Sequence, residues 1–464
     1  MFQAAAGASG GGEGYFGVVF SDYNAIEDQD YNPYLWIDDS NDSSIYMSYI
    51  QRDSSSEQGA TFAKITAGGN VEYARELRVA GRPIEQTMQY DPGTATWTTI
   101  ADYLSGFKFF KINESSITSN PSEVAREAYD ASNNRLGQPS RFSFSRKGSQ
   151  SIICGVTTFT GSKPMYAKID HNGSNFDVVR EGTGDSLSTI FSTYCDPYGS
   201  NQMINFFYRD GYHQVSRTDL SYSNLSQNDA AKKVTFGLST GQINVSYLRA
   251  SSVYYKSGTP FHFMTGADSG LVTYDRAYFT YGSAPNCTDE YRLASSSINA
   301  YPTAITGVVD SGYNVIAIYI AISTTPFNTS PTQYLYKIDT TGTPSISECL
   351  RIDNAGSGFT YPGVIRKLYY DNQYDAVVAL GFAGNGSNPD AFMFRIAGDL
   401  STSGSGSFSW ASVTPPHTLT KLSESQATES GIWGNSTSNG SDSSGTATNT
   451  IISNNNYGTS SVSF

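Results

Sequence analysis

The sequence is poor in charged residues and contains no long apolar run. Only 15% of its 464 residues are charged, whereas about 25% is usual in soluble domains. No segment approaches the roughly 18 consecutive apolar residues that read as a membrane-spanning helix, so we expect no membrane insertion. The first twelve residues have neither a basic stretch nor an apolar core, which predicts that they are not a secretory signal.

Cysteine and histidine are scarce, and they are not arranged as ligands or catalysts. Cys154, Cys195, Cys287 and Cys349 lie far apart without a C-x-x-C pair. We therefore expect isolated, reduced thiols on strands, and assembly in a reducing cytoplasm. The sequence also lacks H-E-x-x-H, G-x-S-x-G and phosphate-binding glycine loops. It thus predicts no catalytic, cofactor-binding or metal-binding residue, and a protein that is not an enzyme.

The charge balance is acidic, with a net charge of −13. No basic stripe is present to neutralise phosphates, which argues against a nucleic-acid partner. Acidic clusters at residues 27–32, 38–42 and 371–375 could supply oxygen ligands to calcium, but none has the spacing of the twelve-residue calcium loop. Asp and Asn are also the residues that tight turns select. We therefore favour turns at these clusters and keep calcium as the alternative.

Aromatic residues and glycine, in contrast, are plentiful. Aromatic residues make up 13% of the chain, with 33 Tyr and 25 Phe, and there are 44 Gly. Aromatic side chains suit a pleated, half-buried surface. This composition predicts an all-β fold.

A repeated pattern runs along the chain: a strand ending in Lys-Ile, a polar turn, and then a strand that carries an arginine. The Lys-Ile positions, with one conservative variant, are Lys64-Ile65, Lys111-Ile112, Lys168-Ile169, Lys337-Ile338 and Arg395-Ile396. The arginines that follow are Arg75, Arg126, Arg180, Arg292 and Arg351. We interpret both sets as blade-packing residues. The alternative, a ring of anion-binding arginines, would require them all on one exposed face.

The spacing of the repeat predicts the architecture. Degenerate copies at residues 212–219 and 274–279 fill the long gap between Ile169 and Lys337. With them, successive copies are roughly 47 to 61 residues apart, which is the length of four short strands with loops, slightly more than the 40–50 residues of familiar propeller blades. We expect a seven-bladed β-propeller over residues 14–416. Residues 1–13 would form a short Ala/Gly-rich arm, and the low-complexity residues 417–464 a docking or blade-closing segment. The repeat also predicts a strand at residues 123–130, where local propensity favours a helix.

Three stretches carry a resemblance to a known family: 39–46, 167–173 and the strand that holds Arg75. Together they resemble the repeat of a bacterial and phage β-propeller family. The glycine-rich start and the abundance of Tyr, Ser, Asn and Gly also resemble tailed-phage virion proteins, especially those of marine phages. This resemblance implies a structural subunit of a tail, fibre or capsid decoration, located in the virion.

From this resemblance we expect a non-enzymatic virion module that docks other virion proteins and copies of itself. A second hypothesis is a carbohydrate- or receptor-binding propeller for host attachment, with exposed tyrosines in the loops 194–198 and 280–285 stacking on a host-surface glycan. A propeller glycosidase is a third, since Asp91-Pro-Gly-Thr-Ala-Thr-Trp97 loosely resembles the Asp-box turn of sialidase propellers. That turn occurs once, and a pair of catalytic carboxylates cannot be recognised from sequence.

Overall fold

The computed structural model describes twenty-five stretches of the chain. They are residues 16–20, 24–25, 33–38, 41–52, 58–79, 87–103, 106–117, 122–126, 143–147, 150–157, 163–170, 176–181, 189–196, 202–209, 212–219, 229–234, 248–267, 276–287, 289–325, 332–355, 363–385, 388–401, 408–422, 428–430 and 457–461. The N-terminal arm predicted at residues 1–13 lies outside them.

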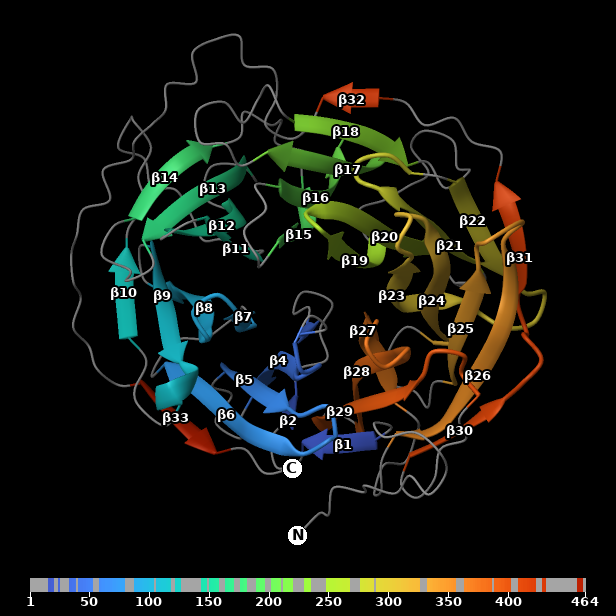
Figure 1. The fold of residues 1–464 in the computed structure, drawn as a ribbon, viewed down its shortest axis with the longest axis horizontal. Coiled ribbons are helices and arrows are strands. Elements are labelled where there is room, and N and C mark those ends of the chain that lie inside the picture. Colours follow the sequence, from blue (N-terminus) through green and yellow to red (C-terminus); the bar gives the residue numbers. More distant parts are fainter. Residues whose placement is uncertain are drawn as a thin grey trace.

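Antiparallel hydrogen bonds join the strands into sheets that follow one another around a ring (Figure 1). Sheet 1 contains β2 (Asn24–Ala25), β3 (Tyr34–Ile37), β4 (Ile45–Arg52), β5 (Gln58–Ile65) and β6 (Val71–Val79); sheet 2 contains β7 (Gln89–Asp91), β8 (Thr96–Tyr103), β9 (Gly106–Asn113) and β10 (Ser122–Arg126). Sheet 3 contains β11 (Ser143–Lys147), β12 (Gln150–Thr157), β13 (Lys163–Asp170) and β14 (Phe176–Glu181); sheet 4 contains β15 (Thr189–Cys195), β16 (Gln202–Arg209), β17 (Tyr212–Asp219) and β18 (Asp229–Val234).

The remaining sheets complete the circle. Sheet 5 contains β19 (Leu248–Lys256), β20 (Thr259–Ala267), β21 (Arg276–Ser283) and β22 (Asp289–Ala294); sheet 6 contains β23 (Tyr301–Val309), β24 (Val315–Ser323), β25 (Gln333–Asp339) and β26 (Ser345–Ala355). Sheet 7 contains β27 (Val364–Asp371), β28 (Ala376–Asn385), β29 (Asn388–Ala397) and, as its outermost strand, β1 (Phe16–Phe20). Because β1 pairs with β29, strands from opposite ends of the chain close the ring. The fold is a β-propeller.

The apolar core lies between neighbouring sheets. Separate clusters of buried side chains join sheets 4 and 5, 5 and 6, 6 and 7, 7 and 1, and 1 and 2. Sheets 5, 6, 7 and 1 are therefore covered by a neighbouring sheet on both faces. This explains why β23 of sheet 6 is buried along its whole length. At Gly307 in β23 the approach is so close that a Cβ atom would lie 2.1 Å from Phe263 of sheet 5.

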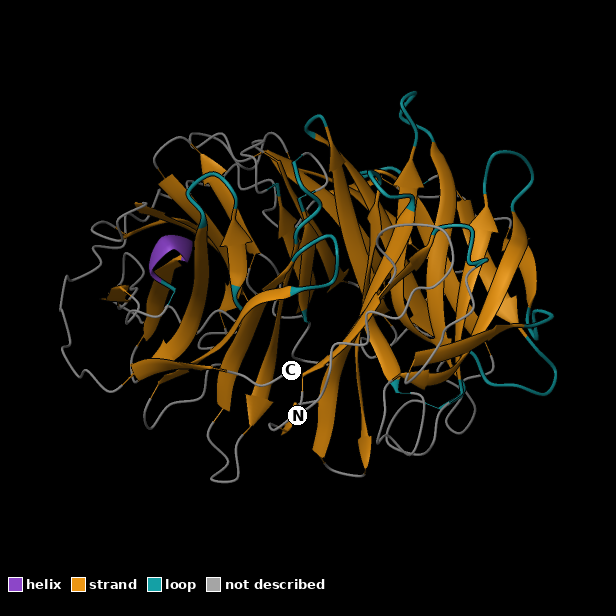
Figure 2. Ribbon diagram, turned by 60° about the horizontal axis from the view of Figure 1, so that its bottom comes forward, coloured by secondary structure: helices purple, strands orange, loops and turns teal. Residues whose placement is uncertain are grey.

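The last part of the chain forms a belt, which we define as β30 (Phe408–Ser412), β31 (Thr418–Leu422), β32 (Thr428–Ser430) and β33 (Tyr457–Ser461). These strands pair with the outermost strands β26, β22, β18 and β6, in that order. The belt thus runs around the ring against the order of the sheets, from sheet 6 back to sheet 1 (Figure 1). Figure 2 shows the same molecule turned, and strands make up almost all of its described regular structure. Its strands cover edges that would otherwise present unpaired backbone groups.

These findings correct the predicted fold class, a seven-bladed propeller with a low-complexity C-terminal segment. The all-β propeller is present. However, the structure describes side chains packed between neighbouring sheets for six consecutive blades, namely sheets 4 to 7 followed by sheets 1 and 2. Of sheet 3 it describes only the backbone. The sheets hold four to six strands rather than a uniform four. Part of the C-terminal segment is regular structure, because β-strands can be held by backbone hydrogen bonds alone and need little apolar surface of their own.

The sequence repeat matches the sheets strand by strand. The Lys-Ile pairs and Arg395-Ile396 lie on the third strand, namely β5, β9, β13, β25 and β29, and the five arginines lie on the fourth, β6, β10, β14, β22 and β26. The strand predicted at residues 123–130 is present as β10, although residues 127–130 lie outside the described residues. The single helix of the described stretches is a three-residue 3-10 turn at Glu114–Ser116, so no helix there could span a membrane.

Candidate binding site on the propeller axis

The third-strand cations of the repeat reach into the neighbouring sheet. Lys64 of β5 forms ion pairs with Glu72 of its own sheet (2.9 Å) and with Glu114 of sheet 2 (3.0 Å). Arg395 of β29 donates from Nη1 to the carbonyl oxygen of Ala67 in sheet 1 at 2.9 Å. In both cases the contacted residue lies within two residues of the end of the third strand of the next sheet.

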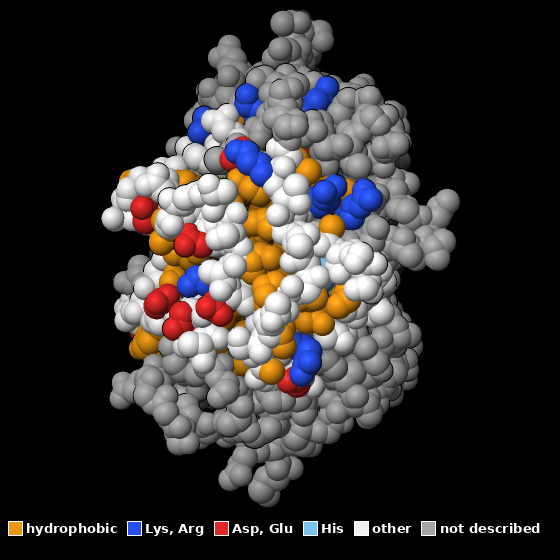
Figure 3. All heavy atoms as spheres, turned by 90° about the vertical axis from the view of Figure 1, so that its right-hand side faces the viewer, with side chains coloured by type: hydrophobic (Ala, Val, Ile, Leu, Met, Phe, Trp, Pro, Cys, Tyr) orange, Lys and Arg blue, Asp and Glu red, His pale blue; other side chains and the backbone are white. Residues whose placement is uncertain are grey.

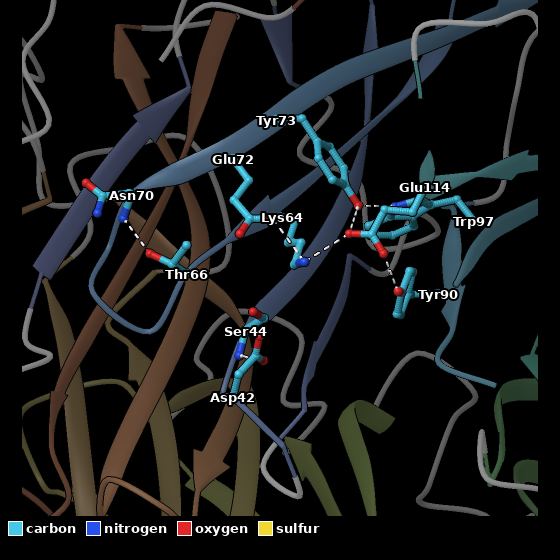
Figure 4. A network of polar contacts seen from close by, with 10 residues as sticks. All are labelled: Asp42, Ser44, Lys64, Thr66, Asn70, Glu72, Tyr73, Tyr90, Trp97 and Glu114. Atoms are coloured by element: carbon cyan, nitrogen blue, oxygen red, sulfur yellow. Dashed lines mark hydrogen bonds and ion pairs between the residues drawn. The ribbon is translucent and has the colours of Figure 1, made fainter. Parts of the chain in front are cut away.

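The joint between sheets 1 and 2 is the most extensively bonded of these contacts (Figure 4). Glu114 accepts hydrogen bonds from Tyr90 at 2.5 Å and from Tyr73 at 3.4 Å, and the indole of Trp97 donates to the Tyr73 hydroxyl at 2.8 Å. Burial and the carboxylate of Glu114 raise the pKa of the Tyr90 phenol. The phenol therefore stays protonated and is no nucleophile; the arrangement joins two blades.

Removing the Glu114 carboxylate should weaken this joint. We expect Glu114→Ala to lower the free energy of unfolding by about 2–3 kcal/mol, because Lys64 and two phenols lose their acceptor in a largely buried setting. Glu72→Ala is the matched control: it removes the other carboxylate of Lys64, but one that is exposed, and should cost about 0.5 kcal/mol or less. Chemical denaturation measures both. Equal losses in the two variants would contradict the interpretation of Glu114 as the joint.

The other predicted packing residues lie as follows. Ile65, Ile112, Ile338 and Ile396 are buried. The ammonium of Lys337 lies over the Tyr319 ring, while Lys111 and Arg75 are half-buried. Arg351 is bonded to Asp353 at an exposed position. Lys168, Ile169, Arg180 and Arg126 lie on strands whose side chains are not described. A packing role common to the whole set stays a prediction.

Two of the three acidic clusters, 38–42 and 371–375, hold an Asp that is bonded within a tight turn. Asp371 Oδ1 accepts the backbone N–H of Gln373 at 2.9 Å, Asp91 Oδ1 that of Gly93 at 3.0 Å, and Asp42 Oδ1 that of Ser44 at 2.9 Å. This bonding of Asp to the backbone two residues on is what tight turns select it for. In the part of the chain that the structure describes, no group of three or more His, Cys, Asp or Glu side chains could hold a metal ion. Residues 27–32 lie outside that part.

The cysteines and histidines whose side chains the structure describes are buried, namely Cys195, Cys287, Cys349, His213, His262 and His417. His262 Nε2 lies 3.4 Å from Cys287 Sγ, a contact between β20 and the loop after β21. Burial lowers the pKa of His262 to about 3 and raises the pKa of the Cys287 thiol to about 12. A reactive cysteine needs the opposite shifts, a thiolate beside an imidazolium. The pair is therefore a neutral packing contact.

Polar side chains from three sheets meet on the axis of the ring, where the innermost strands lie. Lys367 of β27 extends past sheet 6 and donates to the Tyr194 hydroxyl of sheet 4 at 2.9 Å and to the Ser251 carbonyl of sheet 5 at 3.3 Å. The Tyr194 hydroxyl in turn donates to the same Ser251 carbonyl at 2.5 Å, and the hydroxyls of Ser192 and Ser251 lie 2.6 Å apart. We call these four residues, Lys367, Tyr194, Ser192 and Ser251, the axial cluster.

Irregularities in the innermost strands shape the surroundings of the axial cluster. The register shifts by one residue near the start of β15, β19, β23 and β27, leaving Phe191, Arg249, Thr303 and Arg366 as the extra residues. Such bulges re-aim side chains and are common beside functional sites. At two of these bulges the extra residue is an arginine. The guanidinium of Arg249 lies 4.6 Å from the centre of the Tyr301 ring.

The sequence located this region only in part. Tyr194, from one of the two loops proposed for sugar stacking, does belong to the axial cluster. Tyr281, from the other loop, is instead buried and stacks on Tyr291, so it offers no exposed platform. Lys367 was missed, because its role depends on which strand of each sheet is innermost. The bulges leave no signal in the sequence.

Comparison with known proteins supplies no family for the chain. No family model matches the sequence, and no curated protein matches it. Solved structures that it resembles include the polysaccharide lyase Uly1, at 10% identity and a TM-score of 0.41, with 85% of this chain and 94% of that chain covered. The propeller domain of the Trilobed protease from Pyrococcus furiosus is 9% identical, with a TM-score of 0.37 and coverages of 78% and 95%. The NanB sialidase from Streptococcus pneumoniae is 9% identical, with a TM-score of 0.43 and coverages of 82% and 71%.

The enzymes among these structures correct one expectation. The sequence predicted that the protein is not an enzyme, yet a polysaccharide lyase, an oligogalacturonate lyase and a sialidase are among the solved structures that it resembles. That prediction is therefore not kept. Similarities at such low sequence identity and TM-score concern the fold alone and assign no reaction to this chain.

Proposed function

We propose that this protein is a structural module of a phage virion, in the tail, a fibre or the surface decoration, that docks neighbouring subunits. The belt is the observation that carries the proposal. Four blades each hold a belt strand at their outer edge, so the belt strands are the new outermost edges of these sheets, and strand addition at a sheet edge is a general way for one protein to bind another. The virion setting rests on the resemblance in the sequence. Neighbouring subunits would be copies of this chain or other virion proteins.

The outer wall suits contact with other proteins in a watery setting. Figure 3 shows the side of the ring on the right in Figure 1, where apolar side chains form a strip between polar and charged ones. In β31 every residue is exposed or half-buried. The ion pair between Lys421 and Asp289 at 2.7 Å joins β31 to β22 on this wall. Such a mixed surface is typical of interfaces that form between folded subunits.

Mass spectrometry of purified particles tests this proposal. We expect the chain in intact virions at a fixed copy number, retained after washing in high salt. Deleting residues 1–13 should leave a folded monomer that is missing from the particles. Particles that lack the full-length protein, or that incorporate the truncated one normally, would contradict the proposal.

A second proposed function is carbohydrate recognition during host attachment, and the axial cluster favours it. Tyr194 presents a half-buried ring together with a hydroxyl, and Ser192, Ser251 and Lys367 add donors and acceptors around it. Binding sites for small molecules combine an aromatic surface with a few convergent polar groups in this way. A glycan array tests it: binding should be lost in Tyr194→Ala.

A further inference from the structure

The innermost strands concentrate positive charge in an acidic protein. The chain has 29 Lys and Arg but 42 Asp and Glu. The innermost strands β3, β7, β11, β15, β19, β23 and β27 reverse this balance. They carry six basic residues, Arg146, Lys147, Arg249, Lys256, Arg366 and Lys367, and two acidic ones, Asp91 and Asp371. A region lined by one sign of charge attracts ligands of the other sign.

Neither acidic residue compensates this charge near the axial cluster. Asp91 and Asp371 both stand at the last position of their strand, where the chain turns outward to the second strand of the sheet. Asp91 is bonded within its own turn, to Gly93 and Thr94. Asp371 is fully buried against Arg395. Of the six basic residues, Arg249, Arg366 and Lys367 lie nearer the other end of their strands, and these three supply the positive charge near the axial cluster. Arg146, Lys147 and Lys256 stand at the same end as the two aspartates.

Lys367 is the cation at the centre of the axial cluster. Its ammonium is hydrogen-bonded to a hydroxyl and a carbonyl, and it lies 4.9 Å from the centre of the Tyr194 ring. None of these partners carries a formal charge. An ammonium held by neutral groups can exchange one of them for an anionic oxygen, which makes a shorter and stronger hydrogen bond. The four-carbon stem of lysine allows this movement without a change in the backbone.

We propose that the axial cluster binds an anionic sugar, one that bears a carboxylate or a sulfate, and that Lys367 recognises the anionic group. This inference rests on the second proposed function, carbohydrate recognition. The half-buried Tyr194 would bind a sugar hydroxyl, while Ser192 and Ser251, which are buried and bonded to each other, would hold the Tyr194 hydroxyl in place. Arg249 and Arg366, at the two bulges, add to the positive potential. A long phosphate backbone is disfavoured, because the net charge of −13 repels an extended polyanion outside this small region.

Matched sugars and matched variants test this inference. An array would carry neutral, uronate-bearing and sulfated oligosaccharides of equal length. We expect the intact protein to bind an anionic member at least 10-fold more tightly than its neutral counterpart, and salt to weaken only the anionic interaction. Lys367→Met should abolish this preference, and Lys367→Arg should retain it. Lys421→Met is the control, because Lys421 is an exposed lysine on the outer wall.

The outcomes separate the two claims. Equal binding of neutral and anionic sugars, or an unchanged preference in Lys367→Met, would overturn the inference and leave carbohydrate recognition standing. Failure to bind any sugar would overturn both. Whether the uronate or the sulfate arm binds identifies the anionic group. If Lys367→Met does not fold, which its denaturation curve shows, the salt dependence of the intact protein decides between the outcomes.

Discussion

Arg395→Met should destabilise the protein more than any other single change considered above, by about 3–5 kcal/mol. Arg395 and Asp371 form a fully buried ion pair that joins β29 to β27. The same guanidinium is bonded to sheet 1 through Ala67 and lies 4.3 Å from the centre of the Tyr374 ring. Without Arg395, the Asp371 carboxylate would be a buried charge held only by Ser43 and its own turn. Urea denaturation followed by fluorescence measures the change.

Two further variants separate this effect from a general loss of charge. Arg351→Met removes an arginine at the exposed pair with Asp353, and should change the free energy of unfolding by about 0.5 kcal/mol or less. The double variant Arg395→Met/Asp371→Asn should recover part of the loss, because no buried charge is left unpaired. Equal destabilisation by Arg395→Met and Arg351→Met would show that Arg395, with its buried ion pair and its bond to Ala67, does not stabilise the contact between sheets 7 and 1.

As the pH is lowered, the protein should unfold at a higher pH than the titration of its carboxylates alone would cause. Burial lowers the pKa of His213 and of His262 to about 3, while a histidine in an unfolded chain titrates near 6.5. Below about pH 6.5 the unfolded chain therefore binds protons that the folded chain does not. The free energy of unfolding should fall, as the pH drops from about 6.5 to about 3, by roughly 1.4 kcal/mol per pH unit for each histidine.

His262→Leu isolates this contribution. Leucine keeps an apolar side chain of similar size beside Cys287 and cannot bind a proton. Between pH 6.5 and 5, where few carboxylates titrate, the free energy of unfolding should fall less steeply with falling pH in the variant than in the intact protein. The reason is that the variant takes up one proton fewer when it unfolds. Denaturation midpoints at a series of pH values measure the slope. Parallel slopes in the two proteins would mean that His262 is accessible to protons in the folded state.

The sequence contained the repeat, and the repeat predicted much of the architecture. The Lys-Ile pairs mark third strands and the arginines mark fourth strands because each position recurs in five of the seven sheets, all of which are copies of one packing unit. It also identified β10 as a strand against a helical propensity, since packing between sheets outweighs local preference. The repeat predicted that Lys64 takes part in packing between blades, but it did not predict that Glu114 is its partner.

The belt and the axial cluster could not be predicted in this way. The belt strands are rich in Ser and Thr, a composition typical of disorder, and they are placed by backbone hydrogen bonds that leave no side-chain pattern. Lys367, Tyr194 and Ser251 come from three different sheets and are more than a hundred residues apart at the extremes. They meet because the ring curves, and the curvature is a property of the assembled sheets.

Hydrogen exchange of β1 and β31 tests the central claim most directly, namely that a ring is closed by the N-terminal strand and wrapped by the C-terminal belt. Amides of residues 16–20 and 418–422 that pair with β29 and β22 should exchange slowly, close to the rates of the strands beside them. Exchange in both segments at the rate of an unstructured chain would contradict the account, because the ring would then be neither closed nor wrapped.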